Sequence, residues 1–417
     1  MARAAFPPNV GSNSSYRFEC DWLKWVNNNK IVMFTMNLTL TDIQSMIAQT
    51  AEKFAQSELV PVAQKVQDPA HRDVFLTNLK KLAELGFMGL NIESAYGGTE
   101  AGSVAFSLAI TEIAKGCAST AVTCSVNNMV AEVIQSIGNE QQKQQYLSKL
   151  CSGEYAAGAF CLTEASSGSD PANMQTRATR QGDKWVINGS KLFITSAAYA
   201  GVFVVWAVTD NQQPKGRGIS CFLVEANTPG LIIGKEEKKM GQRASATNEV
   251  IFENCEVHES ALLGEFNKGF KIAVGELAGG RIGVASLALG VAQAALEIAT
   301  EHVKDRTQFG QAIADFQGVQ WMLAEQATNL QAARLLIMQA AFKKEEGDYF
   351  GTEASMAKLF ATEKANEACY TAQQLMGGLG YVEDCPIERL VRDVRVTTVY
   401  EGTSEIQKVI IARDILR

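Results

Sequence analysis

The 417-residue chain has few of the residues on which hydrolytic and metal sites are commonly built. It contains three histidines, His71, His258 and His302, and none stands at a metal-ligand spacing from a neighbouring ligand residue. A zinc hydrolase, another metal site or a histidine-dependent triad is therefore not expected. The nine cysteines form no Cys-x-x-Cys pair, and several lie in apolar segments. This pattern indicates buried thiols in a reducing compartment.

Basic runs, long apolar runs and nucleotide-binding loops are also missing. The net charge is -7 and no Lys/Arg-rich run offsets it, so we expect no nucleic-acid partner. No stretch approaches about 18 uncharged apolar residues, so we expect no membrane span. Neither a G-x-G-x-x-G loop between a strand and a helix nor a G-x-x-x-x-G-K-[ST] loop is present. A Rossmann domain or a P-loop is therefore not expected.

Residues 1–36 differ in composition from the remainder, with two adjacent prolines, three consecutive asparagines and no periodicity. We interpret them as a disordered extension or, as the favoured hypothesis, an artefact of start-site choice with Met36 as the true start. A mitochondrial transit peptide is the alternative, although such peptides are rich in Arg and Ser and poor in acids. N-terminal sequencing of the native protein would decide between these possibilities.

In the rest of the chain a segment with helical patterns is followed by a strand-rich segment and then by a second helical segment. This order predicts an α+β multidomain fold. Residues 37–153 predict an N-terminal α-helical domain, whose first helix opens with the capping box Thr41–Gln44. Residues 154–264 predict a small antiparallel β-barrel or sandwich, with two strands joined by an Asn188-Gly189 turn. Residues 265–417 predict a C-terminal four-helix-bundle domain.

The stretch Val399–Gln407 places one carboxylate, Glu401, between an aromatic residue and a glycine. Ser404 and Gln407 have the spacing of a capping box, so a helix should begin at Ser404. Free N–H groups at a helix start can hold a developing negative charge, and Gly402 allows a ligand close to the backbone. Glu401 is thus a candidate general base. Taken alone, the pattern fits an exposed glutamate at the start of a surface helix better.

Four further motifs stand in order along the chain: Phe160–Asp170, Phe193–Thr195, Gly280–Gly283, and a last set made of Arg306–Gly310, Gln317 and Gln374–Gly378. Together they resemble the acyl-CoA dehydrogenase family over about residues 37–417. The likeness is strongest to short-chain (butyryl-type) and short branched-chain members. The chain departs from the family pattern with Ala165 and Ser166 in place of Pro-Gly, and with Phe193 in place of Trp.

The resemblance implies FAD as cofactor, with the pyrophosphate and adenosine half held mostly by a neighbouring subunit. The residues that it assigns to FAD are Phe160, Leu162, Thr163, Ser169, Phe193, Ile194, Thr195, Arg306, Phe309, Gln317, Gln374, Leu375, Gly377, Gly378, Thr403, Ser404 and Glu405. Those that it assigns to the substrate are Ser169, Ala278, Gly280, Arg281 and Gly402. Some family members carry their catalytic Glu at position 280, where this chain has glycine, so the resemblance leaves Glu401 as the catalytic base.

The implied reaction is FAD-dependent α,β-dehydrogenation of a short-chain acyl-CoA to the trans-2-enoyl-CoA, in fatty-acid or branched-chain amino-acid breakdown. The resemblance implies electron-transferring flavoprotein as partner, and a homo-oligomer, with a tetramer as the family's usual state. We expect a bacterial cytoplasmic location, with the mitochondrial matrix as the alternative. Two other functions stay open, an acyl-CoA oxidase on the same scaffold and a non-catalytic flavin-binding assembly protein.

Overall fold

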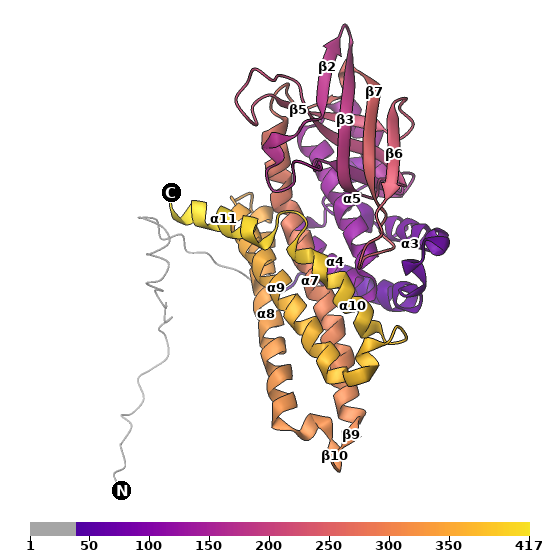
Figure 1. The fold of residues 1–417 in the computed structure, drawn as a ribbon, viewed down its shortest axis with the longest axis vertical. Coiled ribbons are helices and arrows are strands. Elements are labelled where there is room, and N and C mark those ends of the chain that lie inside the picture. The colour runs from indigo at the N-terminus through magenta and orange to yellow at the C-terminus, as the bar shows by residue number, and fades with distance from the viewer. Residues whose placement is uncertain (1–38) are drawn as a thin grey trace.

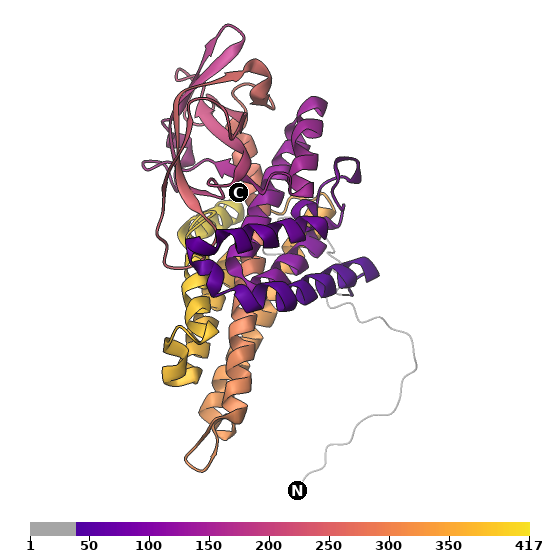
Figure 2. The same ribbon diagram turned by 90° about the vertical axis from the view of Figure 1, so that its right-hand side faces the viewer.

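The computed structural model describes residues 39–417, so the interpretation of residues 1–36 lies outside the described residues. A sheet domain occupies one end of the molecule and long helices extend to the other, with the N-terminal helices packed between them (Figure 1). Figure 2, turned by 90°, shows the same three-part arrangement and places α11 directly beneath the sheet domain. The predicted fold class of helical N- and C-terminal parts around a central sheet domain is confirmed.

The N-terminal part, from residue 39 onwards, contains the α-helices α2 (Asp42–Phe54), α3 (Arg72–Glu84), α4 (Gly102–Gly116), α5 (Ala118–Ile137) and α6 (Glu140–Ser152). The predicted capping box is confirmed, because the Thr41 side chain accepts from the Gln44 N–H and the Gln44 side chain accepts from the Thr41 N–H. Helix α3 ends as expected before Gly86, whose φ of +82° suits glycine. Helix α5 is almost wholly buried and carries the polar residues that meet the sheet domain.

The sheet domain contains β1 (Ala157–Cys161), β2 (Arg177–Gln181), β3 (Lys184–Thr195), β4 (Ala200–Val208), β5 (Ile219–Glu225), β6 (Leu231–Glu236), β7 (Thr247–His258) and β8 (Leu262–Leu263). They form one sheet in the order β6-β7-β3-β2-β4-β5-β8, with β1 paired to β4. Most pairs are antiparallel, as expected, but β1 and β2 both run parallel to β4. The sheet encloses its own hydrophobic core.

The predicted Asn188-Gly189 turn is wrong. Residues 184–195 form one continuous strand, and the pairing with β7 shifts register between Ile187 and Gly189. Gly189 adopts φ +140°, and a Cβ there would lie 2.7 Å from Cα of Thr176. The glycine therefore marks an irregularity in the strand and a close backbone approach rather than a hairpin.

The C-terminal part contains α7 (Gly269–Asp305), α8 (Gln317–Glu345), α9 (Gly351–Met376), α10 (Pro386–Arg395) and α11 (Ser404–Ile415). A short hairpin, β9 (Thr307–Gln308) with β10 (Gln311–Ala312), joins α7 to α8 at the far end of the molecule (Figure 1). Helix α10 was not predicted. Its buried residues Ile387, Leu390 and Val394 nevertheless have helical spacing after Pro386 at the first turn.

Helix α7 is the central element of the helical core and packs against α4, α5, α8 and α9. By length and composition it could cross a membrane, but 78% of its most apolar window is buried inside the protein. Glycines allow the neighbouring helices to approach closely. A Cβ on Gly290 would lie 2.1 Å from the carbonyl oxygen of Thr111 on α4. The same close packing at Gly280 and Gly283 shapes the candidate site.

Candidate active site

Glu401 lies on the short connection between α10 and α11, with its backbone in the left-handed region at φ +52°. A non-glycine residue there is strained, and Gly402 follows at φ +94°. The two left-handed residues turn the chain sharply just before α11 begins at Ser404, as the sequence predicted. The Glu401 side chain therefore points back into the helical core instead of lying along the surface of α11.

The predicted capping box at Ser404 and Gln407 is wrong in its details. The N-cap is Thr403, whose Oγ1 accepts from the Ile406 N–H at 3.4 Å. Ser404 instead donates its hydroxyl to the Glu363 carboxylate on α9. Gln407 donates its amide Nε2 to the carbonyl oxygens of Gly402 at 2.9 Å and Glu401 at 3.3 Å. Because Thr403 has extended ψ and Ser404 is already helical, the cap falls one residue earlier than the pattern indicated.

The Glu401 carboxylate lies against the backbone of α7. A Cβ on Gly280 would lie 2.3 Å from Glu401 Oε2 and 2.9 Å from Met129 Sδ on α5. Glu401 Oε2 is buried and has no hydrogen-bond partner among residues 39–417. The structure thus brings together Glu401 and Gly280, which lie far apart in the sequence, and only glycine at position 280 leaves room for this carboxylate.

Two buried cations flank this carboxylate. Arg281 follows Gly280 on α7, and its guanidinium donates a long 3.4 Å hydrogen bond to Ser355 on α9. Lys358 on α9 is fully buried and donates to the carbonyl oxygen of Gly402 at 2.8 Å. Burial raises the pKa of the Glu401 carboxyl to about 7, although the positive charges of Lys358 and Arg281 oppose this shift. A carboxyl with this pKa is a competent base at neutral pH.

Backbone donors lie beside the same carboxylate. The N–H groups of Glu401 and Gly402 have no hydrogen-bond acceptor within the part of the chain that the structure describes. The first turn of α11 adds the N–H groups of Ser404 and Glu405, which have no intrahelical acceptor. Thr403, Ser404 and Glu405 therefore stand at a helix N-terminus that can receive anionic or electronegative groups.

The first two motifs meet at the ends of adjacent strands. Thr163 follows β1, and its carbonyl oxygen accepts from the Leu192 N–H of β3 at 2.9 Å. Phe193 is in the left-handed region at φ +58°, and 60% of it is exposed. Ile194 is buried, whereas Thr195 and Phe160 are half-buried. Hydroxyl groups and an exposed aromatic face thus gather at one edge of the sheet domain.

A buried ion pair beneath this edge was missed by the sequence reasoning. Lys191, fully buried on β3, donates to Glu164 Oε1 at 2.8 Å and to the Leu162 carbonyl at 3.1 Å. The Glu164 carboxylate also accepts from the N–H groups of Gln175 and Thr176. These bonds fix the loop that carries Thr163 and Ser169. Glu164 lies within the first motif, so the sequence marked it as a candidate functional residue. Its role in fixing the loop depends on partners distant in sequence and could not be predicted.

Contacts across the domain boundary bring the strand edge close to Glu401. Ser196, directly after β3, donates its N–H to the Ala246 carbonyl at 2.8 Å. In the same loop as Ala246, Gln242 donates its side chain to the Tyr400 hydroxyl at 3.3 Å. Gln242 also binds Asp393 of α10 through its backbone N–H and its amide. The same junction between the sheet domain and the helices therefore positions both Thr195 and the loop of residues 400–403 that carries Glu401 (the Glu401 loop).

Comparison with known proteins agrees with this arrangement. Models of the acyl-CoA dehydrogenase N-terminal, middle and C-terminal domains match residues 41–154, 159–255 and 267–416. A mitochondrial short-chain specific acyl-CoA dehydrogenase of Rattus norvegicus is 43% identical over 383 residues, covering 91% of this chain and 92% of that protein. The chain belongs to the acyl-CoA dehydrogenase family.

Two other relatives of the family are similar over most of their length. "Acryloyl-CoA reductase (NADH)" of Anaerotignum propionicum is 42% identical over 388 residues, covering 92% of this chain and 97% of that protein. The solved structure of butyryl-CoA dehydrogenase from Megasphaera elsdenii has a TM-score of 0.88 at 38% identity, covering 92% of this chain and all of that chain. Acyl-CoA dehydrogenases are flavoprotein oxidoreductases, so the predicted enzyme class is confirmed.

The fourth set of motif residues lies elsewhere in this acyl-CoA dehydrogenase family member. Arg306 follows α7, 25 residues after Arg281, which at about 1.5 Å per helical residue places them roughly 37 Å apart. Phe309 on the β9–β10 turn is 94% exposed. The others lie at the start of α8 and the end of α9: Gln317, Gln374, Leu375, Gly377 and Gly378. Within this single chain the set does not contact Glu401.

The remaining predicted substrate residues lie along two elements. Ser169 is exposed on the loop after β1, next to Asp170, which pairs with Lys215. Ala278 is buried on α7, two residues before Gly280. No interaction in the described structure joins Ser169 to Glu401, so their shared role in substrate binding stays a prediction.

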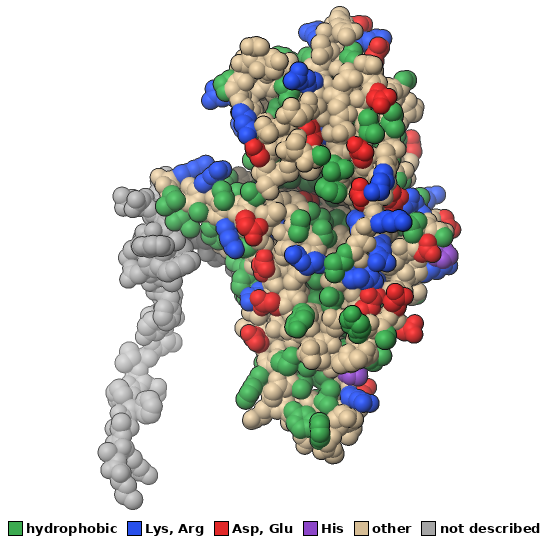
Figure 3. Space-filling view, viewed as in Figure 1, with side chains coloured by type: hydrophobic (Ala, Val, Ile, Leu, Met, Phe, Trp, Pro, Cys, Tyr) green, Lys and Arg blue, Asp and Glu red, His purple; other side chains and the backbone are tan. Residues whose placement is uncertain are grey.

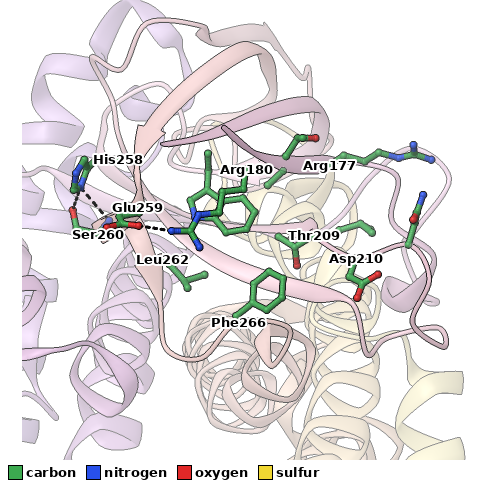
Figure 4. A pocket seen from close by; sticks show the side chains of 14 residues that line it. Arg177, Arg180, Thr209, Asp210, His258, Glu259, Ser260, Leu262 and Phe266 are labelled. Atoms are coloured by element: carbon green, nitrogen blue, oxygen red, sulfur yellow. Dashed lines mark hydrogen bonds and ion pairs between the residues drawn. The ribbon is translucent and has the colours of Figure 1, made fainter. Parts of the chain in front are cut away.

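A cavity of about 640 Å³ opens on the sheet domain rather than at Glu401 (Figure 4). Trp185 and Phe266 line it with stacked rings whose centres lie 5.8 Å apart. Arg180 on its wall is paired with Glu259 at 2.7 Å. The cavity shares no lining residue with the four motifs or the Glu401 loop, so its size is no argument for placing the chemistry there.

Proposed function

We propose that this chain catalyses FAD-dependent α,β-dehydrogenation of a short-chain acyl-CoA, giving the trans-2-enoyl-CoA, with Glu401 as the base. The observation that carries this proposal is the Glu401 carboxylate itself. Its Oε2 atom is buried without a partner, lies against Gly280 and belongs to a group with a pKa of about 7. A structural carboxylate would be paired or exposed, whereas this one is kept available for a proton.

The residues around Glu401 supply the rest of the proton-transfer chemistry. Glu401 takes the proton from the α-carbon, and the negative charge then develops on the thioester oxygen. The unpaired N–H of Glu401 is a donor for that oxygen, and such donors contribute roughly 3–4 kcal/mol in other enzymes. Burial disfavours charged Glu401 before the transfer and so raises its basicity. A flavin held beside Phe193, Thr163 and Thr195 would supply the hydride acceptor for the β-hydrogen.

The residues present fit a flavin at the junction between the sheet domain and α11. The exposed ring of Phe193 offers an aromatic face, and Thr163 and Thr195 offer hydroxyl donors beside it. The first turn of α11, after Thr403, offers the Ser404 N–H, which has no intrahelical acceptor, to the cofactor. Strained backbone conformations of this kind cluster at ligand sites. Contact between the Phe193 ring and a ligand would explain why Phe193 keeps its left-handed φ.

Close helix packing favours a short acyl chain. A Cβ on Gly283 of α7 would lie 2.2 Å from Ser125 Oγ on α5 and 3.3 Å from Phe106 Cζ on α4. Helices α4, α5 and α7 therefore leave no room for even a methyl group one turn beyond Gly280. An acyl chain that passes Glu401 and runs between these helices can therefore extend along α7 by no more than about 4.5 Å, the rise from Gly280 to Gly283. Straight and branched short chains both satisfy this limit.

We further propose that the enzyme is a homo-oligomer and passes its electrons to electron-transferring flavoprotein. The separation of Arg306 and Phe309 from Glu401 supports FAD sites shared between protomers. Large apolar side chains are exposed at the same end, with Trp321 68% and Tyr381 83% exposed. Figure 3 shows hydrophobic side chains across this lower end of the molecule. Light scattering during gel filtration tests for a tetramer, and a monomer that retains FAD would contradict shared sites.

The decisive experiment is Glu401→Gln in the purified flavoenzyme. We expect the variant to keep yellow FAD and bind butyryl-CoA, but to lose anaerobic flavin reduction by several orders of magnitude, because Gln cannot accept a proton. Near-normal flavin reduction by this variant would falsify the assignment. A panel of straight and branched acyl-CoAs of about four to twelve carbons, assayed with an artificial acceptor, tests the chain-length limit.

Three alternatives have distinct outcomes in the same assays. An acyl-CoA oxidase would consume oxygen with a short acyl-CoA. A reductase such as the Anaerotignum propionicum relative would oxidise NADH in the presence of an enoyl-CoA. A non-catalytic assembly protein would retain flavin that no acyl-CoA bleaches under anaerobic conditions.

A further inference from the structure

Lys358 is an unusual residue in the middle of α9. It is completely buried, in a helix whose other buried residues are uncharged and mostly small. Among the described residues its ammonium donates one hydrogen bond, to the Gly402 carbonyl oxygen at 2.8 Å. A buried ammonium with one neutral acceptor is unfavourable unless negative charge lies nearby. Burial lowers the pKa of Lys358 to about 8, and the Glu401 carboxylate is the main group that opposes this shift.

The hydrogen bond from Lys358 reaches the peptide between Gly402 and Thr403, at the end of the turn that carries Glu401. The Gly402 carbonyl oxygen also accepts from Gln407 Nε2 of α11 at 2.9 Å, so two side chains from two helices hold one carbonyl. Glu401 and Gly402 both have left-handed backbones, and their strained turn needs such anchors to persist. A change in the backbone of Glu401 and Gly402 would move the Glu401 carboxylate away from Gly280.

The other nearby cation has no such contact. Arg281 donates to Ser355, and no hydrogen bond joins it to the described residues of the 400–403 loop. The charged groups that act on Lys358 are Glu401 itself, Arg281 on α7, Glu363 on the same helix and Glu405 on α11. Of the two cations beside Glu401, only Lys358 also donates a hydrogen bond to the loop that carries Glu401.

We propose that Lys358 is a positioning residue for Glu401, fixing the 401–402 turn through the Gly402 carbonyl and favouring the charged, proton-accepting form of the base. This inference rests on the proposed role of Glu401. It predicts two separable effects. The hydrogen bond sets the maximal rate, because it holds the carboxylate in place. The positive charge sets the pH at which Glu401 becomes a base.

Two variants separate these effects. Lys358→Met removes the charge and the donor, whereas Lys358→Gln removes the charge but keeps an amide donor. The matched control is Thr362→Val, since Thr362 is buried one turn further along α9 and its hydroxyl binds, within residues 39–417, only the Lys358 backbone carbonyl. The measurement is anaerobic flavin reduction by saturating butyryl-CoA as a function of pH.

We expect both Lys358 variants to shift the acid limb of the pH profile upwards by about one pH unit, because an opposite charge nearby lowers a carboxyl pKa by this order. The maximal rate at high pH should fall more in Lys358→Met than in Lys358→Gln. Thr362→Val should keep the wild-type profile. An unshifted acid limb in Lys358→Gln overturns the electrostatic role, and equal maximal rates in the wild type and both variants overturn the positioning role.

A second readout does not depend on activity. The free energy of unfolding is compared between the wild type and Glu401→Gln, and between Lys358→Gln and the double variant. Each of these two differences changes with pH over the range in which Glu401 titrates. In the Lys358→Gln background this change should occur at higher pH. The same pH range in both backgrounds refutes the inference. If Glu401→Gln alone reduces flavin normally, the proposed function fails; if it is inactive and the Lys358 variants behave as wild type, only the present inference fails.

Discussion

Gly280→Ala is the substitution that tests the geometry of the candidate site most directly. The added methyl group would lie 2.3 Å from Glu401 Oε2 and 2.9 Å from Met129 Sδ. Ordinary contact begins near 3.4 Å, so the carboxylate must move by about 1 Å. A misplacement of this size costs on the order of 100-fold in rate, because proton transfer depends steeply on alignment.

The same change should leave the fold intact. Both close atoms are the ends of flexible side chains, and alanine in a helix is favoured over glycine by about 0.5–1 kcal/mol. We therefore expect a thermal unfolding midpoint within a few degrees of the wild type and little change in KM. The assay is stopped-flow flavin reduction by butyryl-CoA, with thermal unfolding followed in parallel.

Gly275→Ala is the matched control on the same helix, since a Cβ there meets no atom within 4 Å. It should reduce flavin at the wild-type rate. A Gly280→Ala enzyme with wild-type activity would refute the argument that Glu401 acts from its position against Gly280. A loss of activity accompanied by equal loss in Gly275→Ala would show that α7 itself, and not the carboxylate, had been perturbed.

Three further predictions concern stability and cofactor binding. The folded-state pKa of Glu401, about 7, exceeds the ordinary 4.5, so its ionisation costs stability as pH rises between these values. Glu401→Gln should therefore gain about 3 kcal/mol relative to the wild type from pH 4.5 to 8, measured by thermal unfolding; a constant difference would contradict the raised pKa. Lys191→Met should destabilise the fold by about 3–5 kcal/mol by leaving the Glu164 charge buried without its cation, and adding Glu164→Gln should recover part of this loss in the same measurement. Phe193→Gly relieves a left-handed backbone, so the flavin-free protein should melt no lower while FAD dissociates faster, as fluorescence would report.

The sequence predicted most of the fold because its signals are local. Helical periodicity, the Thr41 cap and glycines such as Gly86 set the limits of helices to within a few residues. The Asn188-Gly189 turn failed because that dipeptide occurs both in hairpins and at strand irregularities, and the choice depends on pairing with β7. Helix α10 was missed although its apolar residues have helical spacing, since it is short and half of its residues are charged.

The candidate site was less accessible to sequence reasoning. Family resemblance pointed to Glu401 and Gly280, but the contact between them depends on how α7 passes the loop before α11. Lys358 and Lys191 gave no local signal, because a lysine in a helix or strand is usually solvated. Their burial follows from tertiary packing around them. The family assignment could be predicted; the electrostatic surroundings of Glu401 could not.

The conformation of Glu401 is the strongest reason to regard this loop as selected for chemistry rather than stability. Its left-handed φ, its buried unpaired oxygen and its raised pKa are each unfavourable to the folded state. Lys358 of α9 and Gln407 of α11 offset that cost by donating hydrogen bonds to the Gly402 carbonyl. These two bonds prevent the strained turn from rearranging to a relaxed conformation. A stable surface helix start needs none of these features. Substitutions that relieve the strain at Glu401 should therefore stabilise the fold and abolish the reaction together.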